Sequence, residues 1–575
     1  MGIMIIAFEG IDGSGKTTLA RKLVESLRAR GIEVAETRPS GAEESAVADK
    51  IRDITRDSSS AMLAPVPEFL LFLARYLQQI DEMKERREEI LIADRSFYTP
   101  VFTAAARQAL DVEKALSLTR TCAGDLPWPD LVVLVDVDIE TSSIRKRIAK
   151  IEEKRLGESR RKGTLGLGAR VRLRRVCLET ARVNPGRFIV IDNSAPTPEP
   201  AFEELVRRVL PRLGFRSADP AGEGSAAAGP DLVASDNAPF CGCPWPGAKS
   251  QNTAPPEPAR SSRGPYPDLA RIPAWFYGEV KGLAVAAPKL AALCLKGLAS
   301  TEAWALRESL VDRAIEIVAY SLSNLESDRA RAMRERLADR APYHVLHSLP
   351  FWSVGEEDIR LRRRLVEASP FEVGLSLKGV DTDWSWEIRK QLESLSLPAA
   401  LVSLRGLDTP ESWRIRDLAG KKESKPLLRG LAGATSEPSW TLRRKLVSKH
   451  PIETLQSLAG VGSAEAYALR ARFLPRAPET VMRSIEGLFD DQAMDLRRRA
   501  VTNSREAIGG LWGCESDAAW DLREAYLDLW PAAAVASLGT AWSSLRGRRL
   551  IKKAMAAAPG SLKLGRCITR YMEAE

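Results

Sequence analysis

Near its start the chain reads Phe8-Glu9-Gly10-Ile11-Asp12-Gly13-Ser14-Gly15-Lys16-Thr17-Thr18. An apolar run at 3–7 precedes this stretch and an amphipathic segment at 19–30 follows it, which is the pattern of a strand, a tight loop and a helix. Residues 10–17 satisfy GxxxxGK[ST]. In this setting the pattern predicts a phosphate-binding loop, whereas a glycine-rich turn that only joined a strand to a helix would need neither the lysine nor the hydroxyl.

Each position of the loop has a chemical reason. The three glycines let backbone N–H groups turn toward a phosphate without Cβ clashes, and the positive end of the following helix favours an anion. Lys16 would reach the β- and γ-phosphates, and the Thr17 hydroxyl would ligate Mg²⁺. The candidate nucleotide-binding residues are Gly10, Ile11, Asp12, Gly13, Ser14, Gly15, Lys16, Thr17 and Thr18.

Length and composition limit the class of protein. A chain of 575 residues is long enough for roughly three to four domains. The net charge of +9 comes from 85 basic residues interleaved with 76 acidic ones, which is a weak argument for a polyanionic partner. Without a cleavable leader or an apolar run near the roughly 18 residues of a membrane span, we expect a cytoplasmic protein with no membrane association. The seven scattered cysteines favour reduced thiols over disulfides.

Short apolar runs alternate with helical periods over residues 1–213. The predicted strands are 4–9, 34–38, 90–94, 131–137 and 188–192. Strands separated by helices predict an α/β domain with a mainly parallel sheet and helices on both faces. Ligands bind at the carboxyl ends of the strands in such sheets, where the polar residues of this region gather.

The remainder of the chain divides at about residue 270. Residues 214–270 are rich in Pro, Gly, Ala and Ser and predict a disordered linker. Residues 271–575 repeat with a period of 27, most clearly in Trp386-Glu387-Ile388-Arg389, Trp413-Arg414-Ile415-Arg416 and Trp440-Thr441-Leu442-Arg443. Two short helices per period, the second often opened by proline, predict nine or ten helical hairpins stacked into an α-solenoid that resembles HEAT-type repeats in architecture only.

Arginine recurs once in every repeat. The positions in phase are Arg307, Arg334, Arg362, Arg389, Arg416, Arg443, Arg470, Arg497 and Arg523, usually with a large apolar residue three positions earlier. Such a ladder could bind nucleic acid or an acidic partner along a groove. We favour a structural role, in which each arginine stacks on the preceding aromatic ring or pairs with the next repeat.

The first 210 residues resemble the thymidylate kinase family. Besides the phosphate loop, the matching segments in order are Thr37-Arg38-Pro39-Ser40-Gly41, Glu68-Phe69-Leu70-Leu71-Phe72-Leu73-Ala74-Arg75, Ala93-Asp94-Arg95, Trp128-Pro129-Asp130-Leu131 and Arg187-Phe188-Ile189-Val190-Ile191-Asp192. The resemblance implies a P-loop kinase fold that uses ATP and Mg²⁺ to phosphorylate a nucleoside monophosphate, with dTMP favoured, and it suggests a homodimer through this domain.

The resemblance also assigns roles, which agree with a reaction that depends on positioning and charge neutralisation. Asp94 would hold Mg²⁺ through water or orient the acceptor, Arg95 and Arg38 would clamp the monophosphate, and Asp12 would contact the sugar hydroxyl or an arginine. Phe72 or Phe69 would stack on the base, and Arg75 would read it. Because Gly13 stands where some members carry an arginine, a basic lid would supply charge, and its candidates are Arg155, Arg160 and Arg161.

Some positions depart from the family pattern. Ser96 follows Arg95 where a tyrosine is usual, Thr103-Ala104 stands for a Tyr-Gln pair, and the spacing from Phe72 to Arg75 is one residue short. An alternative is therefore a catalytically degenerate regulatory protein that reports its nucleotide state to the solenoid. A third reading is a nucleic-acid-binding solenoid with an accessory ATPase, but the basic excess is too dilute to favour it. Lys16, Asp94 and Arg95 favour chemistry, with an unidentified protein as the solenoid's partner.

Overall fold

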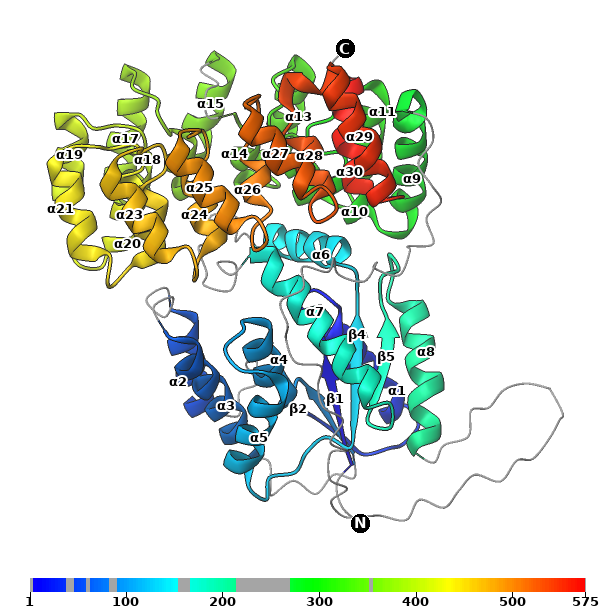
Figure 1. Ribbon diagram of the computed structural model, residues 1–575. Coiled ribbons are helices and arrows are strands. Elements are labelled where there is room, and N and C mark those ends of the chain that lie inside the picture. The colour runs from blue at the N-terminus through cyan, green and yellow to red at the C-terminus, as the bar shows by residue number, and fades with distance from the viewer. Residues whose placement is uncertain are drawn as a thin grey trace.

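The computed structural model describes residues 4–37, 46–57, 63–81, 90–153, 166–213, 269–350 and 355–573. The predicted linker at 214–270 lies outside these ranges except for its last two residues. Figure 1 shows two layers of structure, a sheet domain below and a helical assembly above it.

The sheet has five parallel strands in the order β2-β3-β1-β4-β5. The strands are β1 (Met4–Glu9), β2 (Val34–Thr37), β3 (Ile90–Asp94), β4 (Leu131–Asp136) and β5 (Phe188–Asp192). The helices of this domain are α1 (Lys16–Arg28), α2 (Ala46–Arg56), α3 (Pro65–Asp81), α4 (Tyr98–Ala106), α5 (Val112–Ala123), α6 (Ile139–Glu152), α7 (Gly166–Val183) and α8 (Glu199–Val209), followed by a 3₁₀ turn at Leu210–Leu213. The predicted parallel α/β fold is confirmed.

Apolar helix faces cover both sides of the sheet. On one face, α1 and α8 pack against β1 and its neighbours, with Leu23 and Leu205 fully buried. On the other face, α3, α4, α5 and α7 form a second cluster that includes Phe102 and Cys177. With both faces covered, the strands read as continuous apolar runs and their polar ends meet at one edge.

The second half of the structure is entirely helical within the described residues. After a 3₁₀ turn at Leu269–Arg271 its helices are α9 (Ile272–Ala286), α10 (Pro288–Cys294), α11 (Thr301–Leu310), α12 (Ile315–Ser321), α13 (Asp328–Leu337), α14 (Pro342–Ser348), α15 (Glu356–Leu365), α16 (Pro370–Ser376), α17 (Asp383–Leu395), α18 (Leu397–Ser403), α19 (Pro410–Asp417), α20 (Ser424–Gly430), α21 (Glu437–Leu446), α22 (Pro451–Ser457), α23 (Ala464–Phe473), α24 (Pro478–Ser484), α25 (Asp491–Ala500), α26 (Glu506–Gly509), α27 (Asp517–Ala525), α28 (Pro531–Ala536), α29 (Leu545–Ala557) and α30 (Leu562–Met572), with a 3₁₀ turn at Gly539–Ser543. The short second helices pack against one another from repeat to repeat.

The repeated arginines are structural, as favoured from the sequence. All nine are at most 3% exposed, and each donates from Nη2 to the carbonyl twelve residues earlier, at 2.6–3.3 Å. Arg443, for example, bonds Leu431 and Ala434 after α20 and Ser457 at the end of α22. Because helix carboxyl ends carry partial negative charge, a guanidinium between two of them stabilises the stacking of consecutive repeats.

The solenoid closes on itself, which the repeat pattern did not predict. Helix α30 packs against α9, and Gly565 of α30 approaches so closely that an added Cβ would lie 2.7 Å from Trp275. The carboxylate of Glu573 accepts from Ala299 N at 3.3 Å. In Figure 1 the last helices, in red, therefore stand beside the first ones, in green, and the repeats form a ring.

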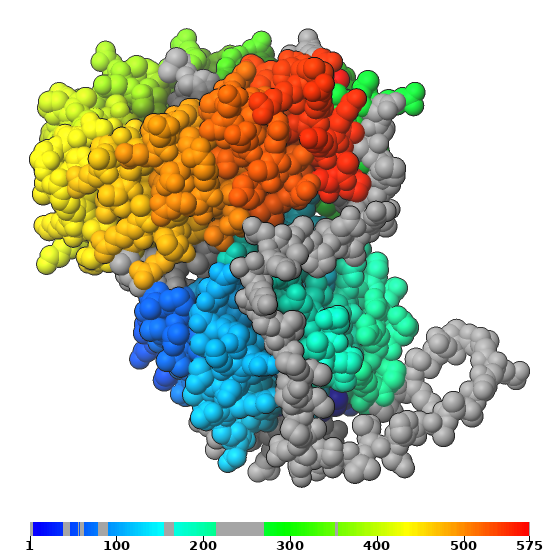
Figure 2. All heavy atoms as spheres, viewed as in Figure 1, coloured from blue at the N-terminus to red at the C-terminus, as the bar shows by residue number. Residues whose placement is uncertain are grey.

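The ring sits on α6 and the start of α7 (Figure 1). Figure 2 shows the sheet domain directly below the ring. Ile144, Ile148 and Ile151 of α6 join the apolar core of the ring. At the start of α7, Gly168 N donates to Asn503 O at 3.1 Å, and a Cβ on this glycine would lie 2.3 Å from Thr502 O. The two halves are thus in direct, partly apolar contact.

Two other expectations concern membrane-spanning helices and the pairing of cysteines. Among the helices that the structure describes, none has both the length and the apolar character that a membrane span requires. The cysteines within the described ranges are Cys122, Cys177, Cys294, Cys514 and Cys567, and all are free thiols.

Candidate active site

The phosphate loop connects β1 to α1 at the carboxyl edge of the sheet. Gly10, Gly13 and Gly15 have φ angles of 139°, 86° and 92°, which L side chains rarely adopt. A Cβ on Gly10 would also lie 2.3 Å from Val135 O, and one on Gly13 would lie 2.6 Å from Ser142 O. The glycines are therefore required both by the turn and by the close approach of β4 and α6.

Lys16 begins α1 and its side chain folds back over the loop. Its Nζ donates to Gly10 O at 2.9 Å and to Ile11 O at 2.8 Å, and the residue is 5% exposed. Burial, together with the nearby Arg95 guanidinium, lowers the pKa of Lys16 to about 8. Both acceptors are loop carbonyls, so a phosphate could replace them as the partner of the ammonium without unfolding any element.

Thr17 and Asp94 meet between α1 and β3. Thr17 Oγ1 donates to Asp94 Oδ2 at 2.5 Å, and Asp94 is 4% exposed. The other carboxylate oxygen, Asp94 Oδ1, is buried and has no hydrogen-bond partner among the described residues. A hydroxyl beside an unsatisfied carboxylate oxygen is a donor set that suits Mg²⁺, so these residues fit the ion that the loop implies.

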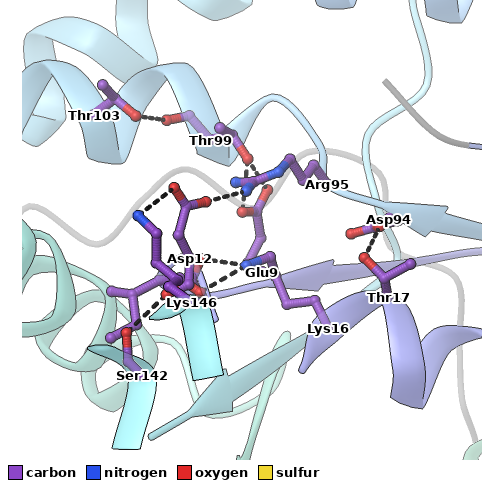
Figure 3. A network of polar contacts seen from close by, with 12 residues as sticks. Glu9, Asp12, Lys16, Thr17, Asp94, Arg95, Thr99, Thr103, Ser142 and Lys146 are labelled. Carbon is purple, nitrogen blue, oxygen red and sulfur yellow. Dashed lines mark hydrogen bonds and ion pairs between the residues drawn. The ribbon is translucent and has the colours of Figure 1, made fainter. Parts of the chain in front are cut away.

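Arg95 and Asp12 form an ion pair across the loop (Figure 3). Arg95 Nη2 lies 2.8 Å from Asp12 Oδ1, and Lys146 Nζ lies 3.7 Å from Asp12 Oδ2. Burial opposes the charge of Arg95, but Asp12, Glu9, Asp94 and Tyr76 together outweigh burial and raise the pKa of Arg95. Arg95 also has φ 98°, an uncommon value outside glycine that turns its side chain back toward the loop.

Glu9 is a site residue that the sequence reasoning did not assign. It ends β1, is 1% exposed, and accepts from Ser96 N at 2.8 Å, Ser96 Oγ at 2.9 Å and Thr99 Oγ1 at 2.8 Å. Burial raises its pKa, although Arg95 and these hydrogen bonds oppose the shift. The serine that replaces the family's usual tyrosine thus anchors this carboxylate, and a charged residue at the end of a buried strand was the available signal.

The candidate base-reading residues lie on α3. Arg75 is 7% exposed, and its Nε and Nη2 have no hydrogen-bond partner among the described residues. Burial lowers the pKa of Arg75. Phe69 is 2% exposed within the apolar core, whereas Phe72 is half-buried and lies 6.0 Å from the guanidinium carbon of Arg107. The geometry makes Phe72 the more accessible ring of the two.

Two further residues touch the loop from the opposite side. Asn193, directly after β5, donates from Nδ2 to Ser14 O at 2.7 Å, and Arg145 of α6 donates to Ala195 O at 2.7 Å and to Ser14 O at 3.5 Å. Neither was predicted. Asn193 could have been found from its place at a strand end, but nothing in the sequence separates Arg145 from its basic neighbours on α6.

Several predicted residues lie outside the described ranges. They are Arg38, Arg155, Arg160 and Arg161. The structure thus brings together Lys16, Thr17, Asp94, Arg95 and Asp12, and it places Arg75 and Phe72 on the neighbouring helix.

The known proteins that resemble this chain match its N-terminal domain. A family model described as thymidylate kinase matches residues 8–203. Relatives include the thymidylate kinases of Pelobacter propionicus, 33% identical over 36% of this chain and 93% of the relative, and of Geobacter sp. strain M21, 32% identical over 36% and 93%. That of Maridesulfovibrio salexigens is 30% identical over 36% of this chain and 96% of the relative.

Among solved structures, a thymidylate kinase from Ehrlichia chaffeensis matches 36% of this chain and 99% of its own length, with 23% identity and a TM-score of 0.27. The sequence relatives are matched over nearly their full length and end before the helical ring begins. Through its N-terminal part the chain belongs to the thymidylate kinase family, a family of nucleoside monophosphate kinases.

Proposed function

We propose that this protein transfers the γ-phosphoryl group of ATP to dTMP and that the ring modulates this reaction. The observation that carries the proposal is the convergence of Lys16, the Thr17–Asp94 pair and the Arg95–Asp12 pair at one sheet edge of a thymidylate kinase-family domain. ATP and Mg²⁺ are the usual cofactors of this family.

On the donor side, the loop N–H groups and Lys16 bind the phosphates of ATP. Lys16 exchanges its carbonyl partners for phosphate oxygens, which also offsets the burial that lowers its pKa. Thr17 and Asp94 would hold Mg²⁺, which when bound neutralises phosphate charge. These groups are already in place, so little reorganisation is needed when charge shifts between the phosphates.

On the acceptor side, Arg95 exchanges Asp12 for the monophosphate, since a guanidinium fork binds phosphate as well as carboxylate. The released Asp12 stays near Lys146 and can accept a hydrogen bond from the acceptor sugar. Arg75 offers two unused buried donors to the base, and Phe72 offers a ring face. Arg38 and one of the three lid arginines would add charge around the transferred group.

The test is ADP release by the full-length protein with ATP, Mg²⁺ and each nucleoside monophosphate in turn. Lys16→Ala should abolish turnover, while Arg21→Ala, which removes an exposed charge from the same helix, should leave it intact. Turnover selective for dTMP supports the proposal. Turnover with another monophosphate alone would overturn the choice of acceptor, and ATP binding without any turnover would overturn the kinase assignment.

A regulatory NTP-binding function is the second candidate, and the contact between α6 and the ring favours it. One side of α6 supports the loop, where Ser142 Oγ donates to Asp12 O at 2.8 Å. The other side packs in the core of the ring. Nucleotide binding could therefore be communicated to the ring even without phosphoryl transfer. ATP binding by the folded protein without phosphorylation of any monophosphate would favour this candidate over the kinase.

Other parts of the proposal rest on the sequence. We retain as predictions the division into 1–213, 214–270 and 271–575, a protein partner for the ring, a homodimer through the kinase domain and a cytoplasmic location. Nucleic acid is disfavoured as a partner, because the repeated arginines are buried in the repeats and do not form a basic surface.

A further inference from the structure

Basic side chains gather where α6 meets the short second helices of the ring. We call this set the inner basic cluster, and its members are Arg147, Lys296, Arg483, Arg505, Lys563, Arg566 and Arg570. At its centre, the Arg147 guanidinium carbon and Lys296 Nζ lie 4.8 and 4.4 Å from the centroid of the Tyr320 ring. Both side chains also donate to the Tyr320 hydroxyl, Lys296 at 2.9 Å.

Carboxylates do not balance this charge. The four that influence the cluster are Glu140, Glu479, Glu486 and Glu506. Of these, Glu140, Glu479 and Glu506 are already engaged. Glu140 accepts from Ser561 Oγ at 2.5 Å and from Lys563 N at 3.0 Å, whereas Glu479 and Glu506 pair with Arg483 and Arg505. Seven cations against four carboxylates leave an excess of three positive charges.

The cations of the cluster differ from the buried arginines of the repeats. No ion pair within the described ranges involves Arg147, Lys296, Lys563, Arg566 or Arg570. Burial and the neighbouring cations lower the pKa of Lys296 to about 7 and that of Lys563 to about 8. Close by, His347 Nε2 is buried without a hydrogen-bond partner. The Arg483 and Arg505 side chains are 60% and 34% exposed, so the cluster is open to solvent. Concentrated positive charge with spare donors at an accessible surface favours the binding of an anion.

Cations from both arcs of the ring surround Arg147. Arg147 contacts Tyr320 on α12. It also lies close enough to Arg483 of α24, Arg505 before α26 and Arg566 of α30 for each to lower its pKa. One side chain therefore spans from one arc of the ring to the other.

We propose that the inner basic cluster binds a short chain of phosphates, either inorganic tripolyphosphate or the triphosphate of a nucleotide. Such a ligand carries about four negative charges, which offset the positive excess, and its oxygens accept from lysine, arginine and tyrosine alike. This site is separate from the phosphate loop and lies on the other side of α6. Arg147 would link the bound anion directly to the helix that supports the loop.

The experiment measures binding by calorimetry on the full-length protein in the Lys16→Ala background, which removes the loop's principal phosphate-binding cation. The probes are sodium tripolyphosphate, ATP and orthophosphate. Lys296→Gln with Arg566→Gln tests the cluster, and Arg549→Gln with Lys552→Gln, two exposed residues of α29, is the control with the same loss of charge. Thermal unfolding of each variant verifies folding.

We expect one tripolyphosphate or one ATP per chain in the Lys16→Ala background and in the control, with much weaker orthophosphate binding. The cluster substitutions should weaken binding at least about 100-fold, because two charge-assisted contacts are lost. ATP binding without tripolyphosphate binding would assign the site to a nucleotide, and the reverse would assign it to the inorganic anion; both support the proposal. No binding by folded Lys16→Ala protein, or equal binding after the cluster substitutions, would overturn it.

Discussion

Arg443 in the ring is fully buried and Arg95 beside the phosphate loop is mostly buried, yet the two guanidiniums use their donors differently. Arg443 bonds the carbonyls of Leu431, Ala434 and Ser457 and two serine hydroxyls, and it lies 4.9 Å from the ring centroid of Trp440. Arg95 holds a carboxylate, Asp12, across the loop and carries an uncommon backbone φ.

The difference shows that the burial of an arginine does not by itself reveal its role. A guanidinium whose donors end on backbone carbonyls is part of the fold, because no ligand can replace those acceptors without breaking helix contacts. A guanidinium paired with a partly exposed carboxylate can exchange that partner for a phosphate of similar geometry. The same chemical group thus serves packing in one half of the molecule and chemistry in the other.

Substitution of Arg95 tests most directly whether this arginine serves the reaction and not the fold. Arg95→Ala should lower kcat/KM for the monophosphate about 1000-fold, and Arg95→Lys about 100-fold, since lysine keeps the charge but loses the fork. Steady-state kinetics with ATP and dTMP give the values. Thermal unfolding should change little. A large loss of stability with intact kinetics in the folded fraction would make Arg95 a structural residue like Arg443.

Arg443→Met is the matching test in the ring. The substitution leaves several buried carbonyls without donors, so we expect the free energy of unfolding of the ring to fall by about 3 kcal/mol. Chemical denaturation followed by circular dichroism measures this change.

The adjacent Arg444 provides the control, because it is exposed and pairs with Glu437 and Glu465 on the surface. Arg444→Met should shift the unfolding midpoint only slightly. Equal shifts for the two variants would show that burial of Arg443 between helix ends does not stabilise the repeat.

These residues also show what the sequence could and could not predict. The strands at 4–9, 90–94 and 188–192 agree with the structure residue by residue, because buried parallel strands read as uninterrupted apolar runs. The role of the repeated arginines followed from periodicity. The serine that often stands fourteen residues later, such as Ser457, was an unused signal, since it marks the helix end that the arginine binds.

Other features depend on contacts that no local pattern encodes. Closure of the ring requires the curvature to add up over all repeats until α30 reaches α9, and a small change per repeat would leave it open. The loop contacts of Arg145 and Asn193 depend on how α6 and β5 approach in space. Likewise, the inner basic cluster joins residues more than 400 positions apart. The net charge of a long segment therefore does not reveal it.

Acidification distinguishes the inner basic cluster from the rest of the ring. Burial, Arg147, His344 and Lys296 together lower the pKa of His347 to about 4 from an ordinary value near 6.5. Between these values the unfolded chain binds a proton that the native state resists, so stability falls as pH drops from 6.5 to 4 and is unaffected by this group above 6.5. His347→Gln should remove roughly 2 kcal/mol of that loss. Urea denaturation at several pH values in this range measures the free energy of unfolding of the wild-type and His347→Gln proteins. The same pH dependence in both proteins would contradict the assignment.

The smallest effect is expected where the ring approaches the acceptor side of the kinase domain. Lys425 of α20 lies 3.9 Å from Asp57, which follows α2, and both side chains are nearly half exposed. An exposed pair at this distance contributes about 0.5 kcal/mol or less, in contrast to the apolar contact on α6. Lys425→Ala should therefore leave the unfolding midpoint and turnover nearly unchanged. If turnover instead changed more than about threefold, the ring would act on the kinase domain through α2 as well as through α6. The ring would then have two connections to the reacting edge of the sheet.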